Sequence, residues 1–211
     1  MPPQSLGILG GTFNPPHLGH IAVASHARTQ LGLERVALMP SHTPPHKPAL
    51  GDSVATDPEQ RLHMCELAVA GHAGLGACAL EVERGGASYT VDTLLSLHDL
   101  YPDTQLTLIL GSDMARTLPS WRRPRELLAL AGLAVAERPG DGREPVRAAL
   151  AELGSTDADT VFLTMPPVDI SSSQVRERVA HGGNIDELVG SVVAAYISER
   201  GLYGPMRTDA G

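Results

Sequence analysis

The sequence has few aromatic residues, few cysteines and no excess of positive charge. Aromatics make up 3% of its 211 residues, so alanine, leucine and valine must form most of any core. The two cysteines, Cys65 and Cys78, form no CxxC pair, which argues against a disulfide framework and favours a reducing compartment. The formal net charge of -8 argues against a nucleic-acid partner, because such proteins usually carry a basic patch.

Long apolar segments are also missing. No apolar run approaches the roughly 20 residues needed to span a bilayer, and the N-terminal residues lack the basic and apolar regions of a signal peptide. We therefore expect no membrane partner and a cytoplasmic location. The 42% hydrophobic content is enough for one core, so we expect a single domain over residues 1–204 and a flexible tail over 205–211. The oligomeric state stays open, a homo-oligomer included.

Short apolar runs alternate with helical patterns along the chain. The predicted strands cover residues 5–9, 35–39, 78–82, 106–110, 133–136 and 161–164. The predicted helices cover residues 18–31, a segment beginning at 57, and residues 90–101, 124–130, 146–153, 172–180 and 192–200. Because the strands lack polar alternation, we expect helices on both faces of a parallel sheet. The fold class is therefore α/β, a doubly wound, Rossmann-like sheet whose ligands lie beyond the carboxyl ends of the strands.

The first predicted strand leads directly into the segment GGTFNPPHLGH, from Gly10 to His20. Gly10 and Gly11 let the backbone approach a ligand without an intervening side chain. His17 and His20 are three residues apart at the start of a predicted helix, so both imidazoles lie on one face. Gly19 keeps this turn thin, and the N–H groups of a helix start favour an anion.

This segment therefore predicts a phosphate site, but it is neither a GxxxxGK[ST] loop nor a GxGxxG turn. Two other interpretations remain open. The segment could be a plain strand–helix turn with surface histidines, or His17 and His20 could bind zinc. A zinc site would need a third ligand, and the sequence offers no obvious one.

A second segment, ISSSQVR at residues 170–176, follows the last predicted strand and begins a helix. Serines at a helix start can cap the helix and can donate to a phosphate. Arg176 lies one turn further on and can make paired bonds to phosphate oxygens. The alternative is a serine-capped helix with a solvated arginine.

Both segments resemble motifs of one family. The first resembles the (T/H)xGH signature of the nucleotidyltransferase superfamily, and its longer string is similar to bacterial nicotinate-nucleotide adenylyltransferases. The second resembles the ISSTxxR motif of the same superfamily, with Ser173 in place of threonine. The resemblance implies that His17, His20 and Arg176 are catalytic. It implies an ATP site formed by Gly10, Gly11, Thr12, Phe13, His17, His20, Gly111, Asp113, Ile170, Ser172, Ser173 and Arg176.

The same resemblance implies an acceptor site between the two motifs. In the PPHK loop, Lys47 would neutralise the acceptor phosphate, and Thr90, at a helix start, would meet its carboxylate. Asp113 would bond ribose hydroxyls, and Trp121 would stack on the pyridine ring, where a positively charged ring gains about 0.5–2 kcal/mol. Two further members of this set carry open questions. Many relatives have Asp where this chain has Asn14, and of Arg122 only the backbone N–H is expected to bind.

The implied reaction transfers AMP from ATP to nicotinate mononucleotide, giving nicotinate adenine dinucleotide and pyrophosphate. We expect Mg²⁺ to be held mainly by the ATP phosphates and water, with no metal cage in the protein. Nicotinamide mononucleotide or phosphopantetheine is the alternative acceptor. A non-catalytic nucleotide sensor and a metal-dependent hydrolase are the more distant alternatives.

Overall fold

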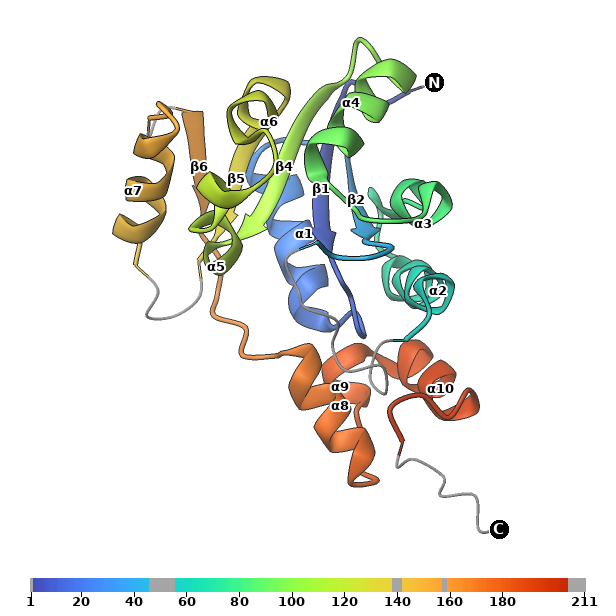
Figure 1. Ribbon diagram of the computed structural model, residues 1–211. Coiled ribbons are helices and arrows are strands. Elements are labelled where there is room, and N and C mark those ends of the chain that lie inside the picture. Colours follow the sequence, from blue (N-terminus) through green and yellow to red (C-terminus); the bar gives the residue numbers. More distant parts are fainter. Residues whose placement is uncertain (1, 46–55, 138–141, 157–158, 205–211) are drawn as a thin grey trace.

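The computed structural model describes residues 2–45, 56–137, 142–156 and 159–204. Its centre is a parallel sheet of six strands in the order β3-β2-β1-β4-β5-β6 (Figure 1). This order is that of the doubly wound Rossmann fold, which confirms the predicted fold class. The strands are β1 (Ser5–Gly11), β2 (Arg35–Pro40), β3 (Leu75–Ala77), β4 (Gln105–Gly111), β5 (Gly132–Ala136) and β6 (Thr160–Leu163).

Helices cover both faces of the sheet, as the lack of polar alternation predicts. Helices α1 (Leu18–Gln30) and α2 (Pro58–Val69) pack on one face, and α4 (Thr90–Leu100), α6 (Pro124–Leu130) and α7 (Glu144–Glu152) pack on the other. Shorter helices lie between these elements. They are α3 (Leu80–Arg84), α5 (Ser112–Ala115) and the 3₁₀ helix η1 (Leu118–Ser120). None of the helices in the described ranges is long and apolar enough to cross a membrane.

The central strands bury both of their faces. Leu108 and Leu110 pack with α4, α6 and α7, whereas Ile109 between them packs with α1 and α2. Successive side chains of a strand point to opposite faces, so a strand covered on both sides must be apolar throughout. This explains why the apolar runs of the sequence predict the positions of β1 and β4 well.

The order of the strands reverses between β1 and β4. The chain builds β1, β2 and β3 outward in one direction, then returns to place β4 beside β1 and continues outward to β6. Sheets of this topology bind their ligands at the carboxyl ends of the two strands where the order reverses, here β1 and β4. Gly11 ends β1 and Gly111 ends β4, so the glycine turn and Asp113 both follow strands at this edge of the sheet.

Three helices near the C-terminus form a cluster of their own. They are α8 (Ser172–Ala180), α9 (Asp186–Val189) and α10 (Ser191–Glu199), and Figure 1 shows them beyond the carboxyl ends of β1 and β2. Their buried residues, among them Val175, Val189 and Val193, pack around Met64 of α2. Helix α2 thus has two buried sides, one against the sheet and one against this cluster.

One predicted strand is wrong. Residues 78–82 were expected to form a strand, but β3 ends at Ala77 and helix α3 begins at Leu80. Cys78 still donates its N–H to Leu38 at 2.9 Å, after which the chain turns. Short apolar runs do not distinguish a strand from a helix, and the LEVER sequence of α3 is rich in good helix formers.

The close packing of β1 gives a stability prediction. A Cβ atom on Gly7 would lie 2.8–2.9 Å from side-chain atoms of Leu33, Val36 and Ile109. We expect Gly7→Ala to lower the free energy of unfolding by about 1–3 kcal/mol through overpacking, measured by urea denaturation. Gly76→Ala in β3 is the matched control, because its Cβ would meet no atom within 4 Å. Equal stability of the two variants would contradict the prediction.

Candidate active site

The turn after β1 presents one glycine to open space and uses the other for packing. A Cβ on Gly10 would meet nothing within 4 Å, whereas a Cβ on Gly11 would lie 3.1 Å from the ring of Phe13. Phe13 is only 2% exposed and has a positive φ of 49°, an uncommon conformation for a residue with a side chain. The predicted close approach of a ligand therefore fits Gly10, while Gly11 makes room for a buried Phe13 ring.

The two histidines stand together at the start of α1. Their rings are stacked, with centroids 3.7 Å apart and planes 25° apart. His17 is the N-cap residue, and its backbone N–H donates to Nδ1 of His20 at 3.1 Å. A Cβ on Gly19 would lie 2.9 Å from Nδ1 of His17, so the predicted need for a thin turn has a concrete cause.

The bond from His17 also fixes the tautomer of His20. A backbone N–H can only donate, so Nδ1 of His20 must hold a lone pair and the ring proton must sit on Nε2. In this state His20 offers an N–H donor from Nε2. The edge of the Phe13 ring packs against the imidazole at 4.8 Å between centroids, which restrains its orientation.

The closing motif binds directly to the glycine turn. Arg176 donates from Nη1 to the carbonyl of Asn14 at 2.7 Å, and Ser172 donates its hydroxyl to the carbonyl of Pro15 at 2.8 Å. The structure thus brings together segments 157 and 162 residues apart in sequence. These bonds occupy the Ser172 proton, which was predicted to reach phosphate. They use one of the five guanidinium N–H groups of Arg176.

The other predicted residues of this motif lie beside these bonds. Ser171 caps α8 and exchanges bonds with Gln174 in a capping box. The Ser173 hydroxyl accepts from Nη2 of Arg176 at 3.1 Å, and Ile170 directly precedes the cap. Serine capping, the simpler interpretation of this motif, is therefore correct for Ser171, and it coexists with the contacts to the glycine turn.

Two residues outside the predicted set also hold the turn. Tyr203 donates its hydroxyl to Oδ1 of Asn14 at 2.7 Å. Burial raises the pKa of Tyr203 to about 12, so the hydroxyl keeps its proton at neutral pH. Arg61 of α2, which is 3% exposed, donates to the carbonyl of Thr12 at 2.7 Å. An arginine among the apolar residues of a helix pattern was the available signal for Arg61, whereas Tyr203 had none.

The predicted acceptor residues gather around the start of α4 and the end of β4. Thr90 is the first residue of α4. Asp113 is the second residue of α5, which begins directly after Gly111. A Cβ atom added to Gly111 would lie 2.6 Å from Oδ1 of Asp113. Trp121 follows η1, packs partly against the core and donates Nε1–H to Thr117 at 2.9 Å. Lys47 lies outside the described residues.

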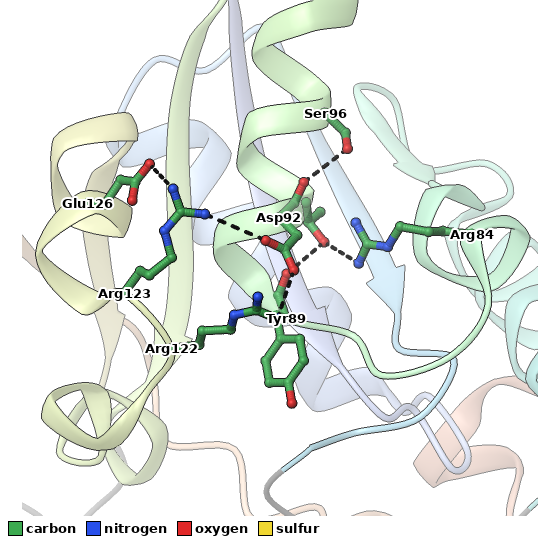
Figure 2. A network of polar contacts seen from close by, with 8 residues as sticks. Arg84, Tyr89, Asp92, Ser96, Arg122, Arg123 and Glu126 are labelled. Carbon is green, nitrogen blue, oxygen red and sulfur yellow. Dashed lines mark hydrogen bonds and ion pairs between the residues drawn. The ribbon is translucent and has the colours of Figure 1, made fainter.

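Figure 2 shows how the Arg122 side chain reaches α4. Its guanidinium carbon lies 4.6 Å from the centroid of the Tyr89 ring, and Nη1 lies 3.5 Å from Oδ2 of Asp92. Arg123 extends the network, with Nη1 3.8 Å from Asp92 and Nη2 2.6 Å from Glu126. These groups are roughly half exposed, so each ion pair contributes little to stability. Their effect is to hold the segment after Trp121 against the start of α4.

No group of three or more His, Cys, Asp or Glu side chains within the described ranges could hold a metal ion. His17 and His20 are stacked on each other, and within the described ranges no third His, Cys, Asp or Glu completes a zinc site with them.

Comparison with known proteins shows which family the chain belongs to. Residues 8–178 match the cytidylyltransferase-like family model. Probable nicotinate-nucleotide adenylyltransferases from Geobacillus thermodenitrificans, Gloeobacter violaceus and Salinibacter ruber are each 40% identical to the chain, over 94%, 95% and 96% of it and 86%, 96% and 99% of their own lengths. The chain belongs to the nicotinate-nucleotide adenylyltransferase family. The family resemblance seen in the two sequence motifs is therefore confirmed over nearly the whole chain.

Solved structures support the fold of this family member. Plasmodium falciparum nicotinic acid mononucleotide adenylyltransferase, complexed with NaAD, superimposes with a TM-score of 0.75 at 18% identity, covering 95% of this chain and 97% of that one. A putative nicotinate-nucleotide adenylyltransferase from Vibrio parahaemolyticus gives a TM-score of 0.66 at 17% identity, with 95% of each chain covered. At this identity the likeness concerns the fold alone.

The open space over Gly10 gives a prediction about ATP. We expect Gly10→Ala to leave the free energy of unfolding within about 0.5 kcal/mol of wild type, because the added methyl meets no protein atom. The methyl should instead obstruct the nucleotide and raise the KM for ATP about tenfold, or about 1.4 kcal/mol. Steady-state kinetics and urea denaturation measure the two effects, with Gly76→Ala as control. An unchanged KM would mean that ATP does not approach over Gly10.

Proposed function

We propose that this protein transfers the adenylyl group of ATP to nicotinate mononucleotide, releasing pyrophosphate and forming nicotinate adenine dinucleotide for NAD synthesis. The observation that carries the proposal is the union of two phosphate-directed motifs. Arg176 and Ser172 bind the carbonyls of Asn14 and Pro15, immediately before His17 at the start of α1. Donors from both ends of the sequence thus come together at the edge of the sheet where a Rossmann-like fold binds nucleotides.

The chemistry needs no nucleophile from the protein. A phosphate oxygen of the mononucleotide attacks the α-phosphorus of ATP in line, and the bond from that phosphorus to the bridging oxygen breaks, so pyrophosphate leaves with the electron pair. The protein positions two anions and stabilises charge on the transferring group. In this proposal, Nε2–H of His20 and the guanidinium of Arg176 donate to the phosphates of ATP. Bound through the phosphates of ATP and water, Mg²⁺ would supply further neutralising charge.

The acceptor is proposed on chemical grounds and on the names of the relatives. The relatives cited above are named for nicotinate mononucleotide as acceptor. The start of α4 offers free helix N–H groups that suit a carboxylate, and Trp121 offers an indole for a pyridinium ring. The cytoplasmic location, the lack of a nucleic-acid partner and the oligomeric state stay predictions.

A direct assay separates the alternatives. Purified protein is incubated with Mg²⁺, ATP and one acceptor at a time. The three acceptors are nicotinate mononucleotide, nicotinamide mononucleotide and phosphopantetheine. Pyrophosphate and the adenylylated product are then measured. The proposal expects the highest kcat/KM with nicotinate mononucleotide. Preference for another acceptor would change the substrate, and no product with any acceptor would leave the nucleotide sensor as the better hypothesis.

Alanine substitutions at His20 and His26, two histidines of the same helix, test the catalytic assignment. We expect His20→Ala to lower kcat about 100-fold or more, because the loss of one donor to the transition state commonly costs this much. His26→Ala is the matched control: His26 also lies on α1, where its ring contacts the Ala22 carbonyl at 3.0 Å, and its loss should leave kcat unchanged. Near-normal turnover of His20→Ala would mean that the catalytic site lies elsewhere.

A further inference from the structure

Arg61 is a buried cation surrounded by backbone carbonyls. It is 3% exposed and lies in the first turn of α2. Nη1 donates to the carbonyl of Thr12 at 2.7 Å, Nη2 to that of His42 at 2.9 Å and Nε to that of Thr56 at 3.1 Å. Burial lowers the pKa of Arg61 by desolvation, but a guanidinium remains charged at neutral pH. Burying such a charge costs desolvation free energy, and an apolar residue would fill a core position on a helix without that cost.

The three carbonyls belong to distinct parts of the chain. Thr12 lies in the glycine turn of the proposed ATP site. His42 follows the end of β2 at Pro40, and Thr56 lies directly before Asp57, the N-cap residue of α2. One planar guanidinium thus fixes the relative positions of the glycine turn, the chain after β2 and the start of α2.

The bond to Thr12 also orients a donor. In a planar trans peptide the C=O and N–H groups point in opposite directions. The described cis peptide bond is Asn14–Pro15, so Thr12–Phe13 is trans. Because Arg61 holds the Thr12 carbonyl, the N–H of Phe13 points away from α2. A fixed amide of this kind is a ready phosphate donor.

We propose that Arg61 is a positioning residue for ATP, holding the Thr12–Phe13 peptide in place through the Thr12 carbonyl. This role rests on ATP binding at the glycine turn and does not depend on which acceptor the protein uses. Arg61 touches neither substrate. Its effect passes through the three carbonyls, and its charge adds to the positive field behind the turn.

Two substitutions at Arg61 and one control test this role. Arg61→Met keeps most of the apolar stem and removes the charge and all three bonds. Arg61→Lys keeps the charge, but its single nitrogen cannot take the place of Nε, Nη1 and Nη2. Met64→Ala is the matched control, because Met64 is fully buried on the same helix but packs against α8–α10. All variants are assayed well below their own melting temperatures, where they are folded.

The readout is the Kd for ATP with Mg²⁺, measured by calorimetry without acceptor. We expect Arg61→Met to raise this Kd about tenfold, the size expected for lost bonds to a charged group. Arg61→Lys should recover part of this loss. Met64→Ala should lower the melting temperature but leave the Kd within about twofold of wild type. A merely structural role for Arg61 predicts that same pattern for Arg61→Met.

The outcomes separate the two proposals. If Arg61→Met, or Arg61→Lys where the Met variant does not fold, binds ATP like wild type, the positioning role is overturned. If wild type forms no dinucleotide with any acceptor, the proposed function fails, and the ATP Kd still decides whether Arg61 positions the turn.

Discussion

The site depends on hydrogen bonds that capture the carbonyls of a single turn. The turn after β1 leaves the sheet at Gly11 and reaches α1 at Leu18, and this short irregular stretch cannot satisfy its own carbonyl groups. Arg61 takes that of Thr12, Arg176 that of Asn14 and Ser172 that of Pro15. A buried carbonyl without a partner costs free energy, so these donors are required by the backbone before any ligand arrives. The same groups hold the backbone of the proposed nucleotide site in place.

This arrangement explains how an acidic protein can bind two polyanions. The net charge of -8 describes the whole chain, whereas binding depends on the local field. Arg61 and Arg176 both lie close enough to Tyr203 to lower its pKa, although burial has the larger, opposite effect. Two cations therefore stand behind one turn, in surroundings where water screens them less than at the surface. The start of α1 adds its N–H groups on the same side.

The parts of the fold and site that depend on neighbouring residues in the sequence could be predicted. Apolar runs located β1, β2, β4, β5 and β6, because a strand buried on both faces carries a continuous signal. The glycine turn and the closing motif were recognisable because each lies next to a strand end. The bonds that join them were not predictable, since Arg61, Arg176 and Tyr203 lie 49, 162 and 189 residues from their partners. The burial of Phe13 beneath Gly11 was missed for a related reason, because a left-handed backbone at a non-glycine residue leaves no local pattern.

Tyr203, which binds Asn14, lies far along the chain from the turn that it holds. Translation delivers the glycine turn first, but the side chains that complete it belong to α8 and to residue 203. A chain truncated before Ser172 would keep the sequence of all six strands but lack both the guanidinium and the phenolic hydroxyl that bind Asn14.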